Sequence, residues 1–326
     1  MAQKCVVTGG GGFIGAHLVK ALVRDGWDVT CLDNMTRGDA SRFAEVADHV
    51  RLHTADIRDT DSVTAACKGA EVVFHLAAVN GTENFYTRPE LVLDMGLRGA
   101  LAVVEACQRA DVPDLVMASS AEVYQTPAQV PTDETVALML PDSLNPRYSY
   151  GGSKIVSELI AFNYGRDNFR KVQVFRPHNV YGPDMGWKHV IPQFILRALA
   201  CRDRGDPLFE IQGDGSETRA FAYVDDVVAG ILRMYAKGGT REIYHIGNDE
   251  EVTIRDLVAL TGKALGQDLD VVPGPAAAGG TPRRCPDIGK MRALGYSPAV
   301  PLAEGLARTC DWYERHRGKV PANDLM

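Results

Sequence analysis

The chain has no apolar run that approaches the ~20 residues needed to cross a membrane as a helix. Its formal net charge of −7 leaves no basic footprint for nucleic acid. The seven cysteines are scattered singly, without the spacing of a disulfide framework or a zinc site. The N-terminus enters the apolar stretch Lys4–Thr8 directly and does not read as a signal peptide. We therefore expect a cytoplasmic protein with reduced thiols, no metal, no nucleic-acid partner and no membrane partner.

The first half of the chain alternates short apolar runs with amphipathic stretches, among them Phe13–Arg24 and Glu90–Arg109. This rhythm predicts an α/β fold, a Rossmann-like doubly wound parallel sheet. The predicted strands are Lys4–Thr8, Asp28–Leu32, Val50–Thr54, Val72–Leu76 and Leu115–Ser119. The second half is less regular and predicts a smaller, mixed α/β substrate lobe. We expect residues 1–170 to form the first domain and residues 171–326 mainly the lobe, with a segment near 215–245 returning to the first domain.

A glycine-rich segment, Thr8–Gly15, follows the first predicted strand and opens the first predicted helix. A glycine turn lets the backbone approach a pyrophosphate, which then lies at the positive end of the helix. Phe13 and Ile14 would supply amides of the first helical turn. Two spacings are possible, one through Gly9, Gly12 and Gly15 and one that begins at Gly10.

Asp33 stands 18 positions after Gly15, at the end of the second predicted strand. A carboxylate there can bind the adenosine ribose and would repel a 2′-phosphate, which favours NAD, together with the neighbouring Asn34. Arg37 leaves NADP open, because an arginine can accommodate that phosphate. After the third strand, Asp56 and Ile57 could either cap a helix or hold the adenine amine.

Tyr150 and Lys154 are four residues apart, which places both side chains on one face of a helix. A phenol is a poor base near neutral pH because its unperturbed pKa is about 10. A nearby ammonium favours the phenolate, so we expect Lys154 to lower the pKa of Tyr150.

Together these features resemble the extended short-chain dehydrogenase/reductases of the NAD-dependent nucleotide-sugar epimerase/dehydratase group. The resemblance covers nearly the whole chain. Its motifs are, in order, Thr8–Gly15, His75–Ala78, Ser119–Tyr124, Tyr150–Lys154, Arg176–Pro183, Arg219–Asp226 and Arg283–Asp287. It implies the glycine spacing Gly9, Gly12, Gly15, a nucleotide-diphosphate sugar substrate and a homodimer through paired helices, one of which bears Tyr150.

The resemblance also implies roles for individual residues. Tyr150 would be the catalytic base, Lys154 would hold the nicotinamide ribose, and Ser120 would bond the reacting oxygen. The remaining residues would line the cofactor cleft (Leu76, Ala77, Ala78) or bind the substrate (Asn179, Arg219, Arg283, His178). His178 is one of three histidines that invite a catalytic assignment; His75 reads better as a core residue with a polar partner, and His189 lies outside every motif.

The reaction type depends on the segment Ser120-Ala121-Glu122. A 4-epimerase needs only tyrosine, lysine and serine, whereas a two-acid 4,6-dehydratase is excluded because Ala121 cannot donate a proton. We therefore expect a nucleotide-sugar 4-epimerase. The alternatives are a dehydratase or a glucuronate-type decarboxylase that uses Glu122, which Arg147 also favours, and a catalytically silent NAD-binding regulator.

Some positions depart from the family pattern and predict a reshaped sugar pocket. Gln125 replaces a glycine, Gly96 replaces an asparagine, and Tyr148-Ser149 replaces Ser-Pro before the tyrosine. The side chains that could shape this pocket are Phe85, Tyr86, Met185 and Trp187.

Overall fold

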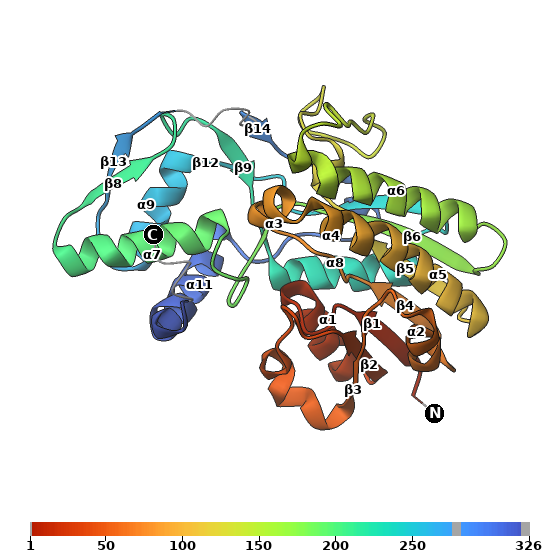
Figure 1. Cartoon of the computed structure of the whole chain (residues 1–326). Coiled ribbons are helices and arrows are strands. Elements are labelled where there is room, and N and C mark those ends of the chain that lie inside the picture. Colours follow the sequence, from red (N-terminus) through yellow and green to blue (C-terminus); the bar gives the residue numbers. More distant parts are fainter. Residues whose placement is uncertain (1, 276–281, 321–326) are drawn as a thin grey trace.

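The computed structural model describes residues 2–275 and 282–320 (Figure 1). Its largest element is a sheet of seven parallel strands in the order β3-β2-β1-β4-β5-β6-β11. Its strands are β1 (Lys4–Thr8), β2 (Asp28–Asp33), β3 (Val50–Thr54), β4 (Val72–His75), β5 (Asp114–Ala118), β6 (Lys171–Pro177) and β11 (Glu242–Ile246). The strand order reverses between β1 and β4, and ligands of such sheets bind at the carboxyl ends beside this point. The Rossmann-like prediction is confirmed, with strand ends that differ from the predicted bounds by one residue at most.

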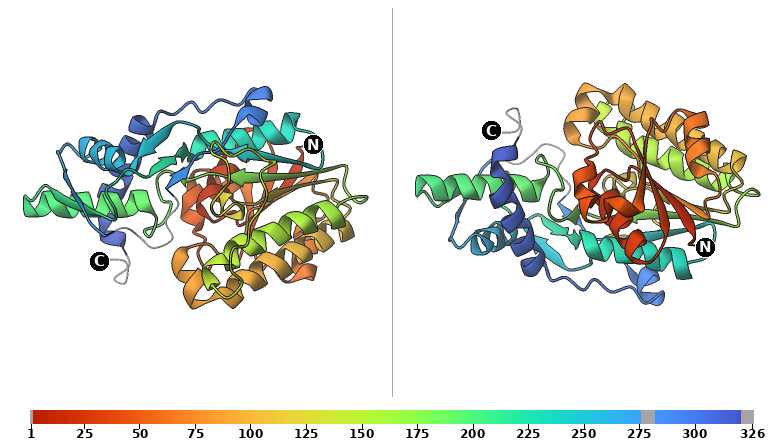
Figure 2. Two further views of the ribbon diagram at one scale, coloured as in Figure 1. Left: turned by 90° about the horizontal axis from the view of Figure 1, so that it is seen from above. Right: turned by 90° about the horizontal axis from the view of Figure 1, so that it is seen from below.

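Helices cover both faces of this sheet (Figures 1 and 2). On one face, α1 (Phe13–Arg24) and α8 (Val224–Lys237) pack an apolar cluster that includes Leu18, Leu22 and Ile231. The other face carries α2 (Thr60–Cys67), α5 (Ala100–Arg109) and α6 (Ser149–Tyr164), which enclose a second cluster. Burial on both faces explains why the central strands β1, β4 and β5 read as nearly continuous apolar runs. Within the described ranges, no helix is both long and apolar enough to cross a membrane.

The helix predicted over Glu90–Arg109 consists of three joined pieces. They are α4 (Pro89–Asp94), a π-helical turn η2 (Met95–Gly99) and α5. A Cβ on Gly96 would lie 2.6 Å from the Cβ of Ser153 on α6, and a Cβ on Gly99 would lie 2.4 Å from Cδ1 of Ile57. The two glycines therefore let this helix approach its neighbours closely. Close packing against Ser153 explains why glycine, and not the asparagine of the family pattern, occupies position 96.

A smaller lobe lies beside the sheet (Figure 1). Its core gathers the apolar faces of α7 (Val190–Arg204), α9 (Ile254–Ala264) and α11 (Leu302–His316). The remaining helical segments are η1 (Ala40–His49), α3 (Thr82–Thr87), η3 (Ala121–Val123), η4 (Pro146–Tyr148), α10 (Gly289–Ala293) and η5 (Arg317–Lys319). The small sheets use β7 (Val180–Tyr181), β8 (Leu208–Ile211), β9 (Thr218–Ala220), β10 (Ala222–Tyr223), β12 (Glu251–Thr253), β13 (Asp270–Pro273) and β14 (Arg283–Arg284). Since β6 and β11 belong to the large sheet, the second half of the chain serves both parts, and the domain boundary at residue 170 stays a prediction.

Candidate active site

The glycine turn connects β1 to α1 at the point where the strand order reverses. Gly9 has a φ of +71°, and a Cβ on it would lie 2.8 Å from Cα of Ala77, which follows β4. A Cβ on Gly15 would lie 2.1 Å from the carbonyl oxygen of Gly9. Gly12 caps α1 without a side chain, so the first-turn amides of Phe13 and Ile14 face no capping group. A turn in which Gly9 and Gly15 leave no room for a Cβ, followed by a helix N-terminus, fits the pyrophosphate of a dinucleotide.

Asp33 is buried at the end of β2, with both carboxylate oxygens engaged. Oδ2 accepts a hydrogen bond of 3.0 Å from the amide of Gly11, and Oδ1 accepts one of 2.9 Å from Met35. The carboxylate therefore ties the glycine turn to the loop after β2. Its two oxygens retain further lone pairs that a ribose hydroxyl could use.

Asp56 lies at the end of β3, close to Asn34. Hydrogen bonds from Arg58, and to a smaller extent the Asn34 side chain, lower the pKa of Asp56. Ile57 is 2% exposed and packs into the core. The structure therefore brings Asp33, Asn34 and Asp56 to the same edge of the sheet, whereas the side chain of Ile57 is buried in the core.

The reactive group of the site is formed by Ser120, which follows β5, and by Tyr150 and Lys154 on α6. The Ser120 hydroxyl interacts with the Tyr150 phenol and opposes the rise of its pKa on burial. Lys154 donates a hydrogen bond of 2.8 Å to the carbonyl of Ala118, and its Nζ lies 5.8 Å from the centroid of the Tyr150 ring. The sequence spacing thus brings all three side chains to the carboxyl end of β5.

The pKa of Tyr150 differs from the expectation. Burial raises the pKa of Tyr150 to about 12, although the hydrogen bond from Ser120 and the charge of Arg37 act in the opposite direction. Burial also lowers the pKa of Lys154 to about 8, against the charge of Glu158. In this structure desolvation therefore dominates the pKa of Tyr150, and Lys154 contacts the carbonyl of Ala118 instead of the phenol oxygen.

Glu122 is held between two arginines beside this group. Oε1 accepts a hydrogen bond of 2.6 Å from Nη1 of Arg284, and Oε2 lies 3.5 Å from Nη2 of Arg147. The two guanidiniums come from distant parts of the chain, β14 and η4. Together they bind the Glu122 carboxylate as an ion pair.

Arg284 was missed by the sequence analysis, which chose Arg283. The two residues form the short strand β14, in which successive side chains point to opposite faces. Arg283 turns outward to Glu251, with a shortest separation of 2.5 Å, whereas Arg284 turns inward to Glu122. The alternation of a strand was the signal that could have identified Arg284.

The other predicted substrate residues approach the same region. Burial and the charge of Arg284 lower the pKa of Arg219, which donates 2.7 Å to the carbonyl of Thr218. Asn179 has a φ of +37° and donates 2.9 Å to the carbonyl of Ala220, so its amide fastens β7 to β9. His178 is 1% exposed, and neither ring nitrogen has a partner among the described residues.

His75 lies in the core, and the candidate pocket residues differ in whether they contact Tyr150, solvent or the core of the lobe. His75 is buried and hydrogen-bonded through Nδ1 to the Thr8 hydroxyl at 2.7 Å, which confirms its assignment to the core. Phe85 stacks on Tyr150, with ring centroids 5.2 Å apart, while Tyr86 is exposed. Met185 and Trp187 pack against the core of the lobe.

Gln125 takes a backbone conformation that suits the glycine expected there, with a φ of +53°. Its side-chain amide donates 2.6 Å to the carbonyl of Glu122. A Cβ on Gly151 would lie 2.4 Å from this amide and 2.7 Å from the Glu122 carbonyl oxygen. The glutamine therefore braces the Glu122 segment against α6.

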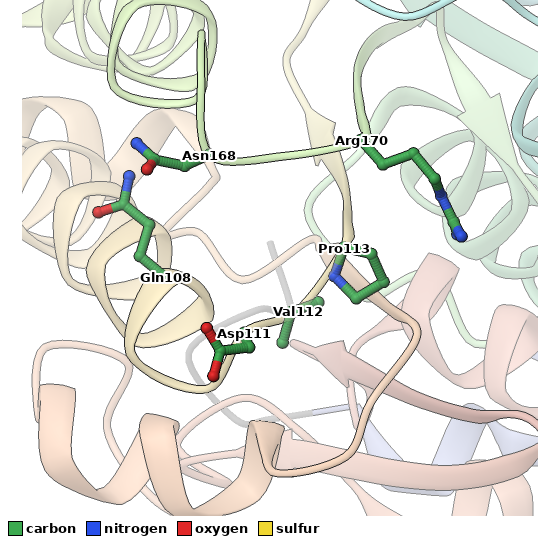
Figure 3. Close-up of a pocket in the computed structure, with 6 residues that line it drawn as sticks. All are labelled: Gln108, Asp111, Val112, Pro113, Asn168 and Arg170. Carbon is green, nitrogen blue, oxygen red and sulfur yellow. The ribbon is translucent and has the colours of Figure 1, made fainter.

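A separate hollow lies at the opposite edge of the sheet (Figure 3). Its walls come from the segments before β5 and β6, and none of the predicted site residues lines it. The lining residues are Gln108, Asp111, Val112, Pro113, Asn168 and Arg170.

Comparison with known proteins agrees with this geometry. Residues 5–247 match the model of the NAD dependent epimerase/dehydratase family. The chain belongs to this family. It is thus an enzyme of a group that uses NAD as cofactor, on an extended short-chain dehydrogenase/reductase fold.

Individual members of the family that resemble the chain differ in reaction. A putative UDP-glucose 4-epimerase from Methanocaldococcus jannaschii is 33% identical over 95% of the chain and 98% of its own length. UDP-glucuronic acid decarboxylase 1 from Danio rerio is 31% identical over 96% of the chain and 73% of its own length. The dTDP-glucose 4,6-dehydratase DesIV from Streptomyces venezuelae, solved with NAD bound, superposes with a TM-score of 0.86 at 30% identity, over 98% of the chain and 99% of DesIV.

Proposed function

We propose that this protein is a nucleotide-sugar 4-epimerase. The observation that carries the proposal is the grouping of Ser120, Tyr150 and Lys154 at the carboxyl end of β5, next to the glycine turn. NAD, when bound, supplies the hydride acceptor. Tyr150 takes the proton of the sugar C4 hydroxyl as C4 is oxidised, and Ser120 donates a hydrogen bond to the reacting oxygen. Lys154 keeps positive charge close to the phenol as it ionises.

The return step requires no further acid. The transient 4-keto sugar turns in the site, hydride returns to the other face of C4, and Tyr150 gives the proton back to the oxygen. In this proposal Gly9, Gly12, Gly15, Phe13 and Ile14 hold the pyrophosphate. The other cofactor contacts would come from Asp33, Asn34, Asp56, Ile57, Leu76, Ala77, Ala78 and Lys154.

The substrate would lie between the reactive group and the lobe. Arg219 and Asn179 are proposed to bind its diphosphate, because a guanidinium matches that group bidentately. Arg284 and His178 face the same region and would complete the sugar site. Arg283 is a weaker candidate than Arg284 because its guanidinium turns away from Glu122 and toward Glu251.

We predict that Glu122→Gln changes kcat by no more than about threefold. Ala121 provides no acid, and both oxygens of Glu122 are engaged by arginines, so neither residue is available to move a proton during epimerisation. Steady-state turnover and retained NAD should be measured on the same preparation. A loss of about 100-fold or more, the scale of general acid–base catalysis, with NAD still bound, would shift the assignment to chemistry at C5.

A labelling experiment tests the proposed reaction. The enzyme is incubated in deuterated water with a panel of UDP- and dTDP-sugars, and the products are examined by mass and by chromatography. We expect an isomer of unchanged mass. Loss of water with uptake of deuterium would indicate a dehydratase, and loss of carbon dioxide a decarboxylase; either result refutes the epimerase proposal.

One specific observation favours a decarboxylase as the second candidate. Arg147 and Arg284 place two positive charges beside Glu122 and Ser120, where a sugar carboxylate could be bound. A glucuronate-type substrate would supply that carboxylate, and oxidation at C4 would then prepare the loss of carbon dioxide from C5. The same panel distinguishes this candidate when it includes a UDP-uronic acid.

We also propose a cytoplasmic location and a homodimer. In support of the dimer, α6 exposes Val156, Leu159 and Tyr164, and the neighbouring α4 exposes Leu93. Large apolar side chains on adjacent helices suit a helix-pairing interface. Light scattering coupled to gel filtration would give the mass in solution.

A further inference from the structure

Arg37 extends across the end of the central strand. It belongs to the loop that follows β2, and its guanidinium donates a hydrogen bond to the carbonyl oxygen of Asn80, in the segment after β4. In the sheet, β1 lies between β2 and β4. The contact between Arg37 and Asn80 therefore joins the loops on either side of β1, the strand that leads through the glycine turn into α1.

The charge of Arg37 has no carboxylate partner in the described part of the chain. Arg42, from the same region, is different: its Nε lies 2.8 Å from Oδ2 of Asp184, and its Nη1 donates 2.9 Å to the carbonyl of Gly11. The Arg37 residue as a whole is exposed, but burial around its guanidinium and the nearby charge of Arg42 lower the pKa of Arg37. Arg37 thus brings a positive charge without a carboxylate partner among the described residues to the loops beside the glycine turn.

The charge of Arg37 influences two titratable groups of the site, Tyr150 and His189. Burial raises the pKa of Tyr150 to about 12, and the charge of Arg37 opposes this rise. Burial lowers the pKa of His189, which caps the lobe helix α7, and the charge of Arg37 lowers it further. The guanidinium therefore lies within electrostatic range of the tyrosine on one side and the start of α7 on the other.

We propose that Arg37 is a binding residue for the pyrophosphate of NAD. Its contact with Asn80 joins the loops on either side of the glycine turn, which leads into the N-terminus of α1, where backbone amides attract an anion. Arginine binds phosphate oxygens through paired hydrogen bonds. The positive charge of Arg37, which has no carboxylate partner among the described residues, would be neutralised by a pyrophosphate.

This role differs from recognition of a 2′-phosphate. A 2′-phosphate would extend from the adenosine ribose beside Asp33, whose carboxylate would repel it. The guanidinium of Arg37 instead points away from the β2 end and toward Asn80. The structure thus favours the pyrophosphate, which NAD and NADP share, as the group that Arg37 binds. It does not favour the 2′-phosphate, which only NADP carries.

The test is equilibrium binding of NAD, NADP, ADP and adenosine to the full-length protein after removal of any retained cofactor. We expect Arg37→Met to weaken NAD and ADP by about 10- to 100-fold, the scale of charge-assisted hydrogen bonds, and to leave adenosine unchanged. Arg37→Lys should lose less affinity for NAD and ADP than Arg37→Met does. Arg24→Met is the matched control, because Arg24 is an exposed arginine of the same domain that pairs with Glu45.

Three results would overturn the proposal. NAD and ADP could bind within twofold of the wild type, NADP alone could be weakened, or adenosine could lose as much affinity as ADP. Thermal melting of each variant checks the fold, and Arg37→Gln replaces the methionine variant if that variant melts early. Because the readout is binding, it is independent of the reaction that the enzyme catalyses.

Discussion

Tyr150→Phe is expected to lower kcat by about 10³-fold, within the range that general acid–base catalysis contributes. The substitution removes only the phenol oxygen that exchanges a proton with the sugar. Phenylalanine retains the ring that stacks on Phe85 and that is 8% exposed in the wild type. The interaction of the phenol oxygen with Ser120 is lost, and Ser120 keeps the amide of Glu122 as a partner at 3.1 Å. The fold should therefore be preserved.

Turnover, retained NAD and the melting temperature should be measured together on the purified variant. Tyr164→Phe is the matched control, since Tyr164 lies on the same helix and is 52% exposed. The control should keep wild-type activity. If Tyr150→Phe also kept it, Tyr150 could not be the proton acceptor.

Glu158→Ala is expected to lower the free energy of unfolding by about 3–5 kcal/mol, the loss typical of breaking a buried ion pair from one side. Glu158 on α6 receives two hydrogen bonds from Arg176 on β6, of 2.8 and 2.6 Å, and one from the hydroxyl of Ser119. The exposed fraction is 4% for Glu158 and 2% for Arg176. Without the carboxylate, the guanidinium would remain buried with only neutral partners, and α6 would lose its polar tie to the sheet.

Chemical denaturation of the variant gives this change in free energy. The comparison is Asp311→Ala, which removes an exposed pair with Arg315 on α11 and should cost less than about 1 kcal/mol. If Glu158→Ala lowered the free energy of unfolding by as little as Asp311→Ala does, the buried pair would contribute no more to stability than a surface pair. Arg176→Met combined with Glu158→Leu should recover part of the loss, because an apolar pair leaves no charge buried.

Much of the fold could be predicted because the strands and helices of the first half have strong local patterns. Lys4–Thr8, Phe13–Arg24 and Val50–Thr54 were predicted with the bounds that the structure has. The strands β6 and β11 were not predicted, because each lies next to irregular segments and is identified only by its pairing within the sheet. Pairing between distant segments leaves no local periodicity to read.

The candidate site was predicted in part, and the differences have physical causes. Spacing along a helix put Tyr150 and Lys154 on one face, but it carried no information on burial, which dominates the pKa of Tyr150. The pair Arg283-Arg284 was visible in the sequence, yet only the orientation of β14 decides which of the two faces Glu122. The sequence predicts that Arg37 could accommodate a 2′-phosphate, whereas the direction of its side chain depends on a contact with Asn80 that no motif predicts.

The most direct test of the central claim is to follow the hydrogen on C4. The nucleotide sugar that the panel identifies as substrate should be prepared with deuterium at C4 and converted in ordinary water. We predict a primary isotope effect on turnover and a 4-epimer that keeps its deuterium at C4, because the hydride leaves and returns within one active site. A product that has exchanged this deuterium with solvent, or that has lost water or carbon dioxide, would contradict the assignment as a 4-epimerase.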